Sequence, residues 1–161
     1  MNSFKIEQAD GKLIEKLAKE IWTEHYISIL SKEQIDYMLE KYQSKKAVEE
    51  QIKNGYSYFI MYLDDVISGY TGIVFEKDKM FLSKLYVKKQ ARKKHIAKNT
   101  LDYLKKLCIE KGYNKIYLTV NKNNSASVNA YKNMGFYEID STVTDIGNGF
   151  VMDDYIMELC F

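Results

Sequence analysis

The chain has 161 residues, the length of one domain with a single apolar core, and we expect residues 1–161 to form one such domain. Its 24 Lys and Arg residues nearly balance its 22 Asp and Glu residues, which argues against a polycation that binds nucleic acid or a membrane surface. No apolar run approaches the roughly 20 residues that span a bilayer, and the first residues lack a signal-peptide pattern, so we expect a cytoplasmic protein.

The first third of the sequence predicts one short strand followed by three helices. Residues 4–9 have the pattern of a strand. Three helical patterns follow, and each begins with a polar residue suited to cap its first turn, namely Asp10, Ser31 and Ser44. In the second pattern Gln34 stands three residues after the cap, which is the spacing of a capping box. Gly55 is the expected end of the third helix.

The middle of the sequence predicts an antiparallel meander. Three runs rich in β-branched and aromatic residues occupy residues 56–63, 66–75 and 80–87. The pair Asp64-Asp65 joins the first two runs, and a short polar turn joins the second to the third. Because turns this short connect antiparallel neighbours, we expect the three strands to pair in chain order.

The last part of the sequence alternates between helical and strand patterns. A helix over residues 96–112 ends at a glycine, and residues 115–120 form an apolar strand. A short helix and a closing hairpin follow, over residues 123–135 and 136–161. The order of strand, helix and strand from residue 80 to residue 120 is a crossover unit, which predicts that its two strands run parallel.

A basic loop connects the strand over residues 80–87 to the helix over residues 96–112. It contains Arg92, Lys93 and Lys94, and Lys98 follows in the first turn of that helix. Loops at the carboxyl ends of strands bind ligands in α/β sheets, and the free N–H groups of a helix start hold phosphate oxygens. A solvated surface and a nucleic-acid patch with Tyr86 and Tyr103 as stacking residues are the alternatives.

The segment from Leu82 to Leu101 resembles the coenzyme A loop of the GCN5-related N-acetyltransferases, the GNAT family. In that family an Arg or Gln, two variable residues, a Gly, one variable residue and a Gly or Ala follow a strand. Arg92 and Ala97 match this pattern, and His95 stands where the family has Gly.

A second segment, residues 120–136, is similar to the final helix of the same family. Asn124 and Tyr131 match the family pattern, and Ser127 stands where Ala is usual. Residues 24–44 and the ending at 146–159 resemble a bacterial branch that includes polyamine acetyltransferases. The resemblance therefore covers nearly the whole chain.

The resemblance implies an α/β fold of the GNAT type, with a mixed, mostly antiparallel central sheet that splays between strands 4 and 5 and is flanked by helices. It implies acetyl-coenzyme A as cosubstrate, with the backbone of Leu85, Tyr86 and Val87 beside the pantetheine arm. The pyrophosphate would lie at Arg92, Lys93, Lys94, His95, Ile96, Ala97 and Lys98, and the same cofactor cleft would include Asn124 and Ser127.

The resemblance also implies direct acetyl transfer to an amine through a tetrahedral intermediate, with Tyr131 protonating the leaving thiolate. Glu24, His25 and Tyr26 are candidates for the wall that binds the acceptor, because that region forms the acceptor wall in the family. A small primary amine is expected, with polyamines favoured. No residue pattern identifies the general base.

Two alternative functions remain open. One is a regulator that binds coenzyme A without turnover, and the other is a nucleic-acid-binding module that uses the basic loop over residues 92–98. Cys108 and Cys160 lack the spacing of a zinc site or a disulfide, so we expect free thiols and no metal. We expect neither nucleic acid nor a membrane as partner, and a homodimer is a further expectation.

Overall fold

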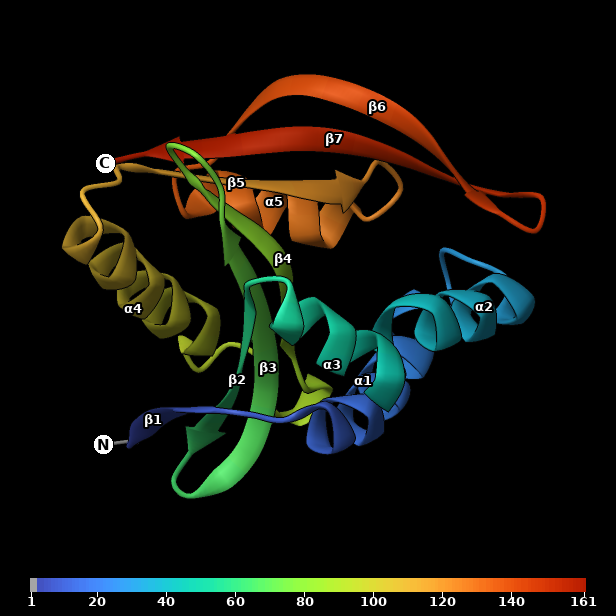
Figure 1. Ribbon diagram of the computed structural model, residues 1–161, viewed down its shortest axis with the longest axis horizontal. Coiled ribbons are helices and arrows are strands. Elements are labelled where there is room, and N and C mark those ends of the chain that lie inside the picture. The colour runs from blue at the N-terminus through green and yellow to red at the C-terminus, as the bar shows by residue number, and fades with distance from the viewer. Residues whose placement is uncertain (1–2) are drawn as a thin grey trace.

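The computed structural model describes residues 3–161, which form a seven-stranded sheet with helices on both faces (Figure 1). In chain order the elements are β1 (Phe4–Gln8), α1 (Gly11–Tyr26), α2 (Lys32–Gln43), α3 (Lys45–Lys53), β2 (Tyr56–Leu63), β3 (Val66–Phe75), β4 (Met80–Val87), a 3₁₀ turn (Lys89–Ala91), α4 (Ile96–Glu110), β5 (Lys115–Asn121), α5 (Ser125–Asn133), β6 (Tyr137–Gly147) and β7 (Phe150–Cys160). The helices and strands agree with the sequence predictions to within about two residues, whereas the 3₁₀ turn was not predicted.

The predicted helix caps are present, with one correction. The side chains of Asp10, Ser31 and Ser44 each accept a hydrogen bond from a backbone N–H in the first turn of α1, α2 and α3. The capping box at Ser31 is only half formed. Instead of reaching back to the cap, the Gln34 side chain donates from Nε2 to the carbonyl of Val151 at 3.1 Å. A tertiary contact between α2 and β7 therefore replaces the local bond that the spacing predicted.

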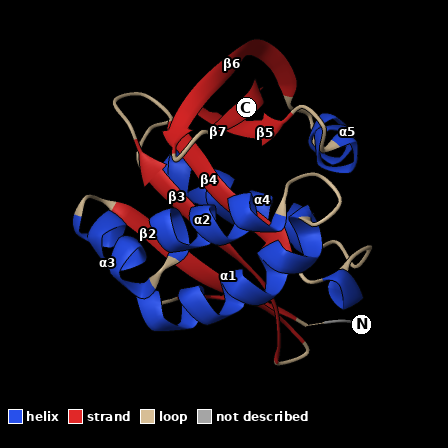
Figure 2. Ribbon diagram, turned by 90° about the vertical axis from the view of Figure 1, so that its right-hand side faces the viewer, coloured by secondary structure: helices blue, strands red, loops and turns tan. Residues whose placement is uncertain are grey.

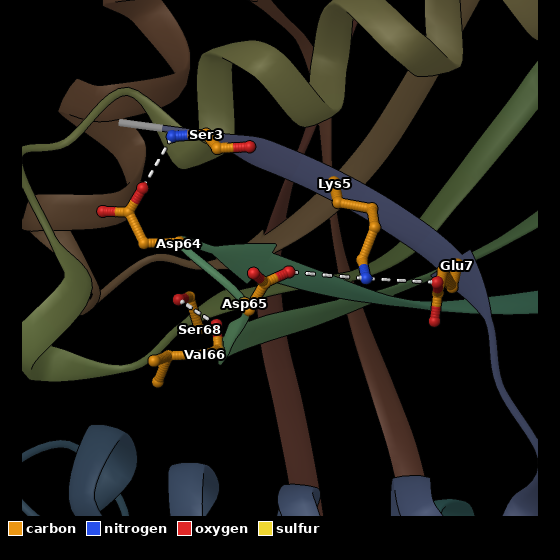
Figure 3. A network of polar contacts seen from close by, with 7 residues as sticks. All are labelled: Ser3, Lys5, Glu7, Asp64, Asp65, Val66 and Ser68. Atoms are coloured by element: carbon orange, nitrogen blue, oxygen red, sulfur yellow. Dashed lines mark hydrogen bonds and ion pairs between the residues drawn. The ribbon is translucent and has the colours of Figure 1, made fainter. Parts of the chain in front are cut away.

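The meander forms as predicted, and its first turn is tied to β1 (Figure 3). Asp64 and Asp65 both have positive φ, 52° and 65°, which is the backbone of a two-residue hairpin turn. The backbone N–H of Ser3 donates to Oδ1 of Asp64 at 2.8 Å, and Lys5 lies 3.7 Å from Asp65. These contacts are exposed, so the ion pair contributes little stability, but they fix where β1 joins the sheet.

The two faces of the meander are covered by different helices. Along β2, Tyr58 and Ile60 face α1, α2 and α3, while Phe59 faces α4. This alternation follows from the two-residue period of a strand, and it places one apolar cluster on each side of the sheet. Figure 1 shows the helices α1–α3 on one side of β2 and β3 and α4 on the other.

The sheet divides between β4 and β5. The sheet order is β1-β2-β3-β4-β5-β7-β6, and the only parallel pair among residues 3–161 is β4 with β5. These two strands are paired only at Met80 with Ile116 and at Phe81 with Tyr117. Figure 2 shows β5, β7 and β6 leaving β2–β4 as a separate arm. The predicted parallel pair and the splayed, mostly antiparallel α/β sheet are confirmed.

Residues 3–161 contain neither a candidate membrane span nor a candidate metal cluster. No helix in this part of the chain is both long and apolar enough to span a bilayer. Within the same residues, His, Cys, Asp and Glu side chains form no group of three or more that could hold a metal ion. Cys108 is buried and Cys160 is exposed, and both are free thiols, as the sequence predicted.

Candidate active site

A cavity of about 500 Å³ opens where β4 and β5 diverge. Residues of α1, α2, α3, β2, β4, β5, α5, β6 and β7 line it, so segments from the whole length of the chain meet at this point. The splay creates the space because strands that are no longer hydrogen-bonded to each other can admit a ligand between them.

The strand β4 supplies an open edge to the cavity. Beyond Phe81 it has no partner in β5 within the described chain, so its N–H and C=O groups on that side are not used in the sheet. A bulge at Ser83 lies between Leu82 and Lys84, where the register with β3 shifts by one residue. Leu85 and Tyr86, two of the predicted backbone-binding residues, line the cavity. The third, Val87, packs against the cluster around Ile96.

The basic loop adopts a left-handed backbone at two residues, although residues 88–98 contain no glycine. Lys93 and His95 have φ of 64° and 62°, in the left-handed region that glycine enters without strain. This conformation disfavours L-residues by roughly 1–2 kcal/mol, although His tolerates it better than most residues do. His95 therefore keeps the shape that glycine would provide and precedes the first turn of α4.

The first turn of α4 differs from those of the other four helices. No side chain caps it, whereas a side-chain oxygen caps α1, α2, α3 and α5. The first N–H groups of any helix lack partners inside the helix and sit at the positive end of its dipole. In α4 these groups belong to Ile96, Ala97 and Lys98, the predicted pyrophosphate residues. The Ile96 side chain is buried, so it offers only its backbone.

The basic side chains gather around a separate hollow. Lys94, His95 and Lys98 line it together with Leu63 and Asn99, and they are not among the residues that line the main cavity. Lys98 lies 3.6 Å from Asp102 one turn along α4. Arg92 donates from Nε to the carbonyl of Val87 at 3.4 Å, which holds the loop against the end of β4. The side chains of Arg92, Lys93 and Lys94 are exposed and can meet an anion from solvent.

The helix α5 and its cap residue bring Tyr131, Ser127 and Asn124 together at the main cavity. Oδ1 of Asn124 accepts the Ser127 N–H at 3.3 Å, which caps the helix. The Tyr131 ring packs edge-on against Phe136 with centroids 5.5 Å apart. Burial, followed by the proximity of Tyr26, raises the pKa of the Tyr131 phenol, so the phenol is protonated at neutral pH.

His25 lines the same cavity and contacts Asn124. The Nδ2 atom of Asn124 lies 3.0 Å from Nε2 of His25. Because Oδ1 of Asn124 is used by the helix cap, its Nδ2 faces His25 as a donor, and Nε2 must accept with the ring proton on Nδ1. Burial and then the Arg92 charge lower the pKa of His25, which favours this neutral form.

Aromatic side chains form the wall between α1 and β4. The hydroxyl groups of Tyr26 and Tyr86 are hydrogen-bonded to each other at 2.8 Å. The centroid of the Trp22 ring lies 5.4 Å from that of Tyr26 and 5.5 Å from that of Tyr86. Burial raises the pKa of Tyr26 to about 12. Tyr26 and His25 both line the cavity, and their role as an acceptor wall stays a prediction. Glu24 is exposed and does not line the cavity, and its role stays a prediction.

The sequence reading missed two ionisable residues in the cavity. Lys84 of β4 donates from Nζ to the Ser83 hydroxyl at 2.8 Å, and burial lowers its pKa to about 8. Asp154 of β7 is 7% exposed, and burial raises its pKa to about 6. A lysine or an aspartate inside an apolar strand is unusual, and that was the signal available in "MFLSKLYV" and "FVMDDYIM".

The comparisons with known proteins agree with this geometry. The family model described as an acetyltransferase (GNAT) domain matches residues 27–159. A spermidine N(1)-acetyltransferase from Thermoplasma acidophilum is 29% identical over 154 residues, which span 92% of this chain and 93% of that protein.

Solved structures show the same fold. The PaiA N-acetyltransferase from Thermoplasma acidophilum, solved in complex with coenzyme A, superposes with a TM-score of 0.83 at 24% identity and covers 99% of both chains. A GNAT-family acetyltransferase from Staphylococcus aureus gives a TM-score of 0.71 at 18% identity, over 98% of this chain and 99% of that one. At these identities the structural likeness supports the fold rather than the acceptor.

Proposed function

Because the chain belongs to the GNAT acetyltransferase family, we propose that it moves an acetyl group from acetyl-coenzyme A to a primary amine of a small, polyamine-like molecule. One observation carries this proposal. The cavity at the β4–β5 splay joins an open strand edge to an aromatic wall, so a thioester and an amine can meet inside it.

At the donor end of the cavity, main-chain N–H and C=O groups are suited to bind acetyl-coenzyme A. The free edge of β4 at residues 85–87 offers hydrogen bonds to the amides of a pantetheine arm. The uncapped first turn of α4 offers N–H groups to a pyrophosphate, with Arg92, Lys93 and Lys94 adding positive charge. Acetyl-coenzyme A supplies the activated acetyl group, and the residues of the chain bind it and manage the protons.

Tyr131 is the proposed general acid. Its raised pKa keeps the phenol protonated, and a thiolate expelled into the same buried cavity is also a stronger base than in water. Burial therefore raises the pKa of both the Tyr131 phenol and the leaving thiol, so the two stay matched for proton transfer. Proton donation of this kind contributes about 10²- to 10⁴-fold to the rate of an acyl transfer.

The acceptor end favours a cationic amine with an apolar chain. Trp22, Tyr26 and Tyr86 present aromatic rings, whose faces attract cations and whose surfaces pack against methylene groups. Asp154 adds a carboxylate to the same cavity. The similarity to a spermidine acetyltransferase over nearly the whole chain supports the polyamine class.

The test is calorimetric titration with acetyl-coenzyme A, followed by thiol release with spermidine, spermine, putrescine and small monoamines. We expect binding of acetyl-coenzyme A and release that depends on a primary amine and is fastest with a polyamine. Binding without release on any amine would contradict the proposal in favour of a regulator. Salt-dependent binding of oligonucleotides without binding of acetyl-coenzyme A would instead favour the nucleic-acid module.

The proposal includes the organisation of the protein. We propose that residues 1–161 act as one acetyltransferase domain in the cytoplasm, without metal, nucleic acid or a membrane as partner. A homodimer stays a prediction. Sedimentation of the purified protein measures its oligomeric state, and activity after metal chelation checks that no metal is needed.

A further inference from the structure

Asp154 is a buried carboxylate that forms no ion pair with any side chain of residues 3–161. It lies in β7, is 7% exposed, and lines the cavity. Its Oδ1 atom is inaccessible to solvent and has no hydrogen-bond partner among the described residues. A buried carboxylate oxygen without a donor is costly, because burial removes its water and nothing replaces it. A ligand in the cavity can supply the missing partner, because rotation of the carboxylate about χ2 turns either oxygen toward the cavity that Asp154 lines.

The charged and titratable neighbours of Asp154 do not provide that partner. Lys122 pairs through Nζ with Oδ1 of Asp153 at 3.0 Å, so its charge only partly offsets burial and the adjacent Asp153, which together raise the Asp154 pKa. Tyr26 on α1 is engaged with Tyr86, and its proximity to Asp154 raises the Tyr26 pKa. Lys84 lines the same cavity, but its ammonium group is bonded to Ser83.

We propose that Asp154 binds the ammonium group of the acceptor amine and removes one of its protons before attack, which makes it the general base of the reaction. This inference rests on the proposed acetyl transfer. A primary ammonium has three N–H donors and a positive charge, which match both needs of an isolated buried carboxylate.

The proton balance is complete with this assignment. One proton passes from the ammonium to Asp154, and the free amine then forms a C–N bond to the thioester carbonyl carbon. When the C–S bond breaks, Tyr131 gives its proton to the thiolate and is reprotonated by the second proton of the attacking nitrogen. Asp154 returns its proton to water as the product leaves, so one ammonium and one thioester give one amide, one thiol and one proton.

The other titratable groups of the cavity are less suited to this role. The His25 lone pair at Nε2 already accepts from Asn124. Lys84 is a cation below its pKa of about 8 and would repel an ammonium at neutral pH. Asp154 has a pKa raised to about 6, so it is ionised at neutral pH and is a stronger base than an ordinary carboxylate.

The experiment compares Asp154→Asn with Asp153→Asn. Both remove one negative charge from adjacent positions of β7, but Asp153 pairs with Lys122 and does not line the cavity. At pH 7.5 we expect Asp154→Asn to lower kcat/KM for the amine by about 10²- to 10⁴-fold. Asp153→Asn should stay within about threefold of the unmodified protein, and acetyl-coenzyme A should bind both variants with unchanged Kd.

The pH dependence separates a base from a structural residue. The unmodified protein should lose kcat/KM below about pH 6, where Asp154 becomes protonated. The Asp154→Asn variant can use only the amine that is already unprotonated in solution. Its kcat/KM should therefore rise about tenfold per pH unit toward the amine pKa, and the difference from the unmodified protein should shrink by the same factor. Lys84 titrates near pH 8 in both proteins, so their ratio at each pH cancels its effect.

Folding is checked in the same proteins. Since the folded protein raises the Asp154 pKa from 3.8 to about 6, it binds the proton more tightly than the unfolded chain does, and the ionised carboxylate destabilises it above pH 6. The Tm of Asp154→Asn at pH 7.5 should therefore equal or exceed that of the unmodified protein.

Each outcome has one meaning for this proposal. A folded Asp154→Asn variant with kcat/KM within threefold of the unmodified protein, or with a defect independent of pH, would overturn the role of Asp154. No amine-dependent thiol release by the unmodified protein would overturn the proposed acetyl transfer itself, and with it this assignment. A pH-dependent loss of kcat/KM confined to Asp154→Asn would establish it.

Discussion

The two ends of the cavity are built from different parts of the polypeptide. At the donor end, the open edge of β4 and the uncapped start of α4 offer backbone N–H and C=O groups. At the opposite end, side chains from α1, α5 and β7 line the cavity, among them His25, Tyr131 and Asp154, and the proposed proton transfers depend on Tyr131 and Asp154. Side-chain replacement should therefore have small effects at the donor end and large effects at the acceptor end.

His95 illustrates the tolerance of the donor end. The GNAT pattern has glycine at this position, and the chain keeps the required left-handed backbone with a histidine, at φ 62°. Asn124 illustrates the opposite case. Its two amide atoms are both committed, one to the cap of α5 and one to His25, so a change of a single atom alters the site.

Tyr131→Phe should impair catalysis most. It removes the proposed proton donor and keeps the ring that packs on Phe136. We expect kcat to fall by about 10²- to 10⁴-fold, with an unchanged Kd for acetyl-coenzyme A, measured by thiol release and calorimetry. Tyr103→Phe is the control, because that ring packs on Phe59 from α4 and does not line the cavity. Equal kcat values for the two variants would contradict the role of Tyr131.

Asn124→Asp should reverse the way in which His25 makes stability depend on pH. Aspartate still caps α5, but it presents an acceptor to His25 in place of a donor, so the His25 pKa should rise instead of being lowered. In the unmodified protein the His25 pKa is lowered by folding, so the unfolded chain binds the proton more readily and the folded state loses stability as the pH falls through 6.5. In the variant the folded state should bind the proton more readily, so it should gain stability over the same pH range.

The His25 pKa can be followed by NMR titration in a His95→Gln background, since the sequence has two histidines. Asn123→Asp is the matched control, because its side chain is exposed next to Asn124 and adds the same charge. An equal shift of the His25 pKa in both variants would indicate a general charge effect and would rule out the specific contact.

His95→Gly should have the smallest effect. The left-handed backbone is already present, so the only gain is relief of roughly 1 kcal/mol of strain. Because the free protein already has this backbone, the relief applies to the free and the bound protein alike, and we expect the Kd for acetyl-coenzyme A to change by no more than about fivefold, measured by calorimetry. Lys93→Gly, at the other left-handed position of the loop, should behave alike. A Kd change of a hundredfold at His95 alone would mean that the imidazole itself takes part in binding.

Much of the fold followed from local patterns. The strand runs, the helix caps and the glycine stops each depend on a few neighbouring residues, and the GNAT resemblance supplied their arrangement. The capping box at Ser31 was an exception. Its sequence spacing is present, but the Gln34 side chain donates to the carbonyl of Val151 in β7 and not to the helix cap. The 3₁₀ turn at Lys89–Ala91 also lacked a periodic signal, since three residues are too few to show one.

The order of the elements, the parallel crossover and the two motifs that contain Arg92 and Tyr131 could all be inferred from local sequence patterns. Tertiary structure alone decided that His25 meets Asn124 from 99 positions away, and that Lys84 and Asp154 enter the same cavity. The physical reason is that caps and turns are short-range interactions. Burial, and the pKa shifts that follow from it, depend on which distant segments exclude water from a side chain.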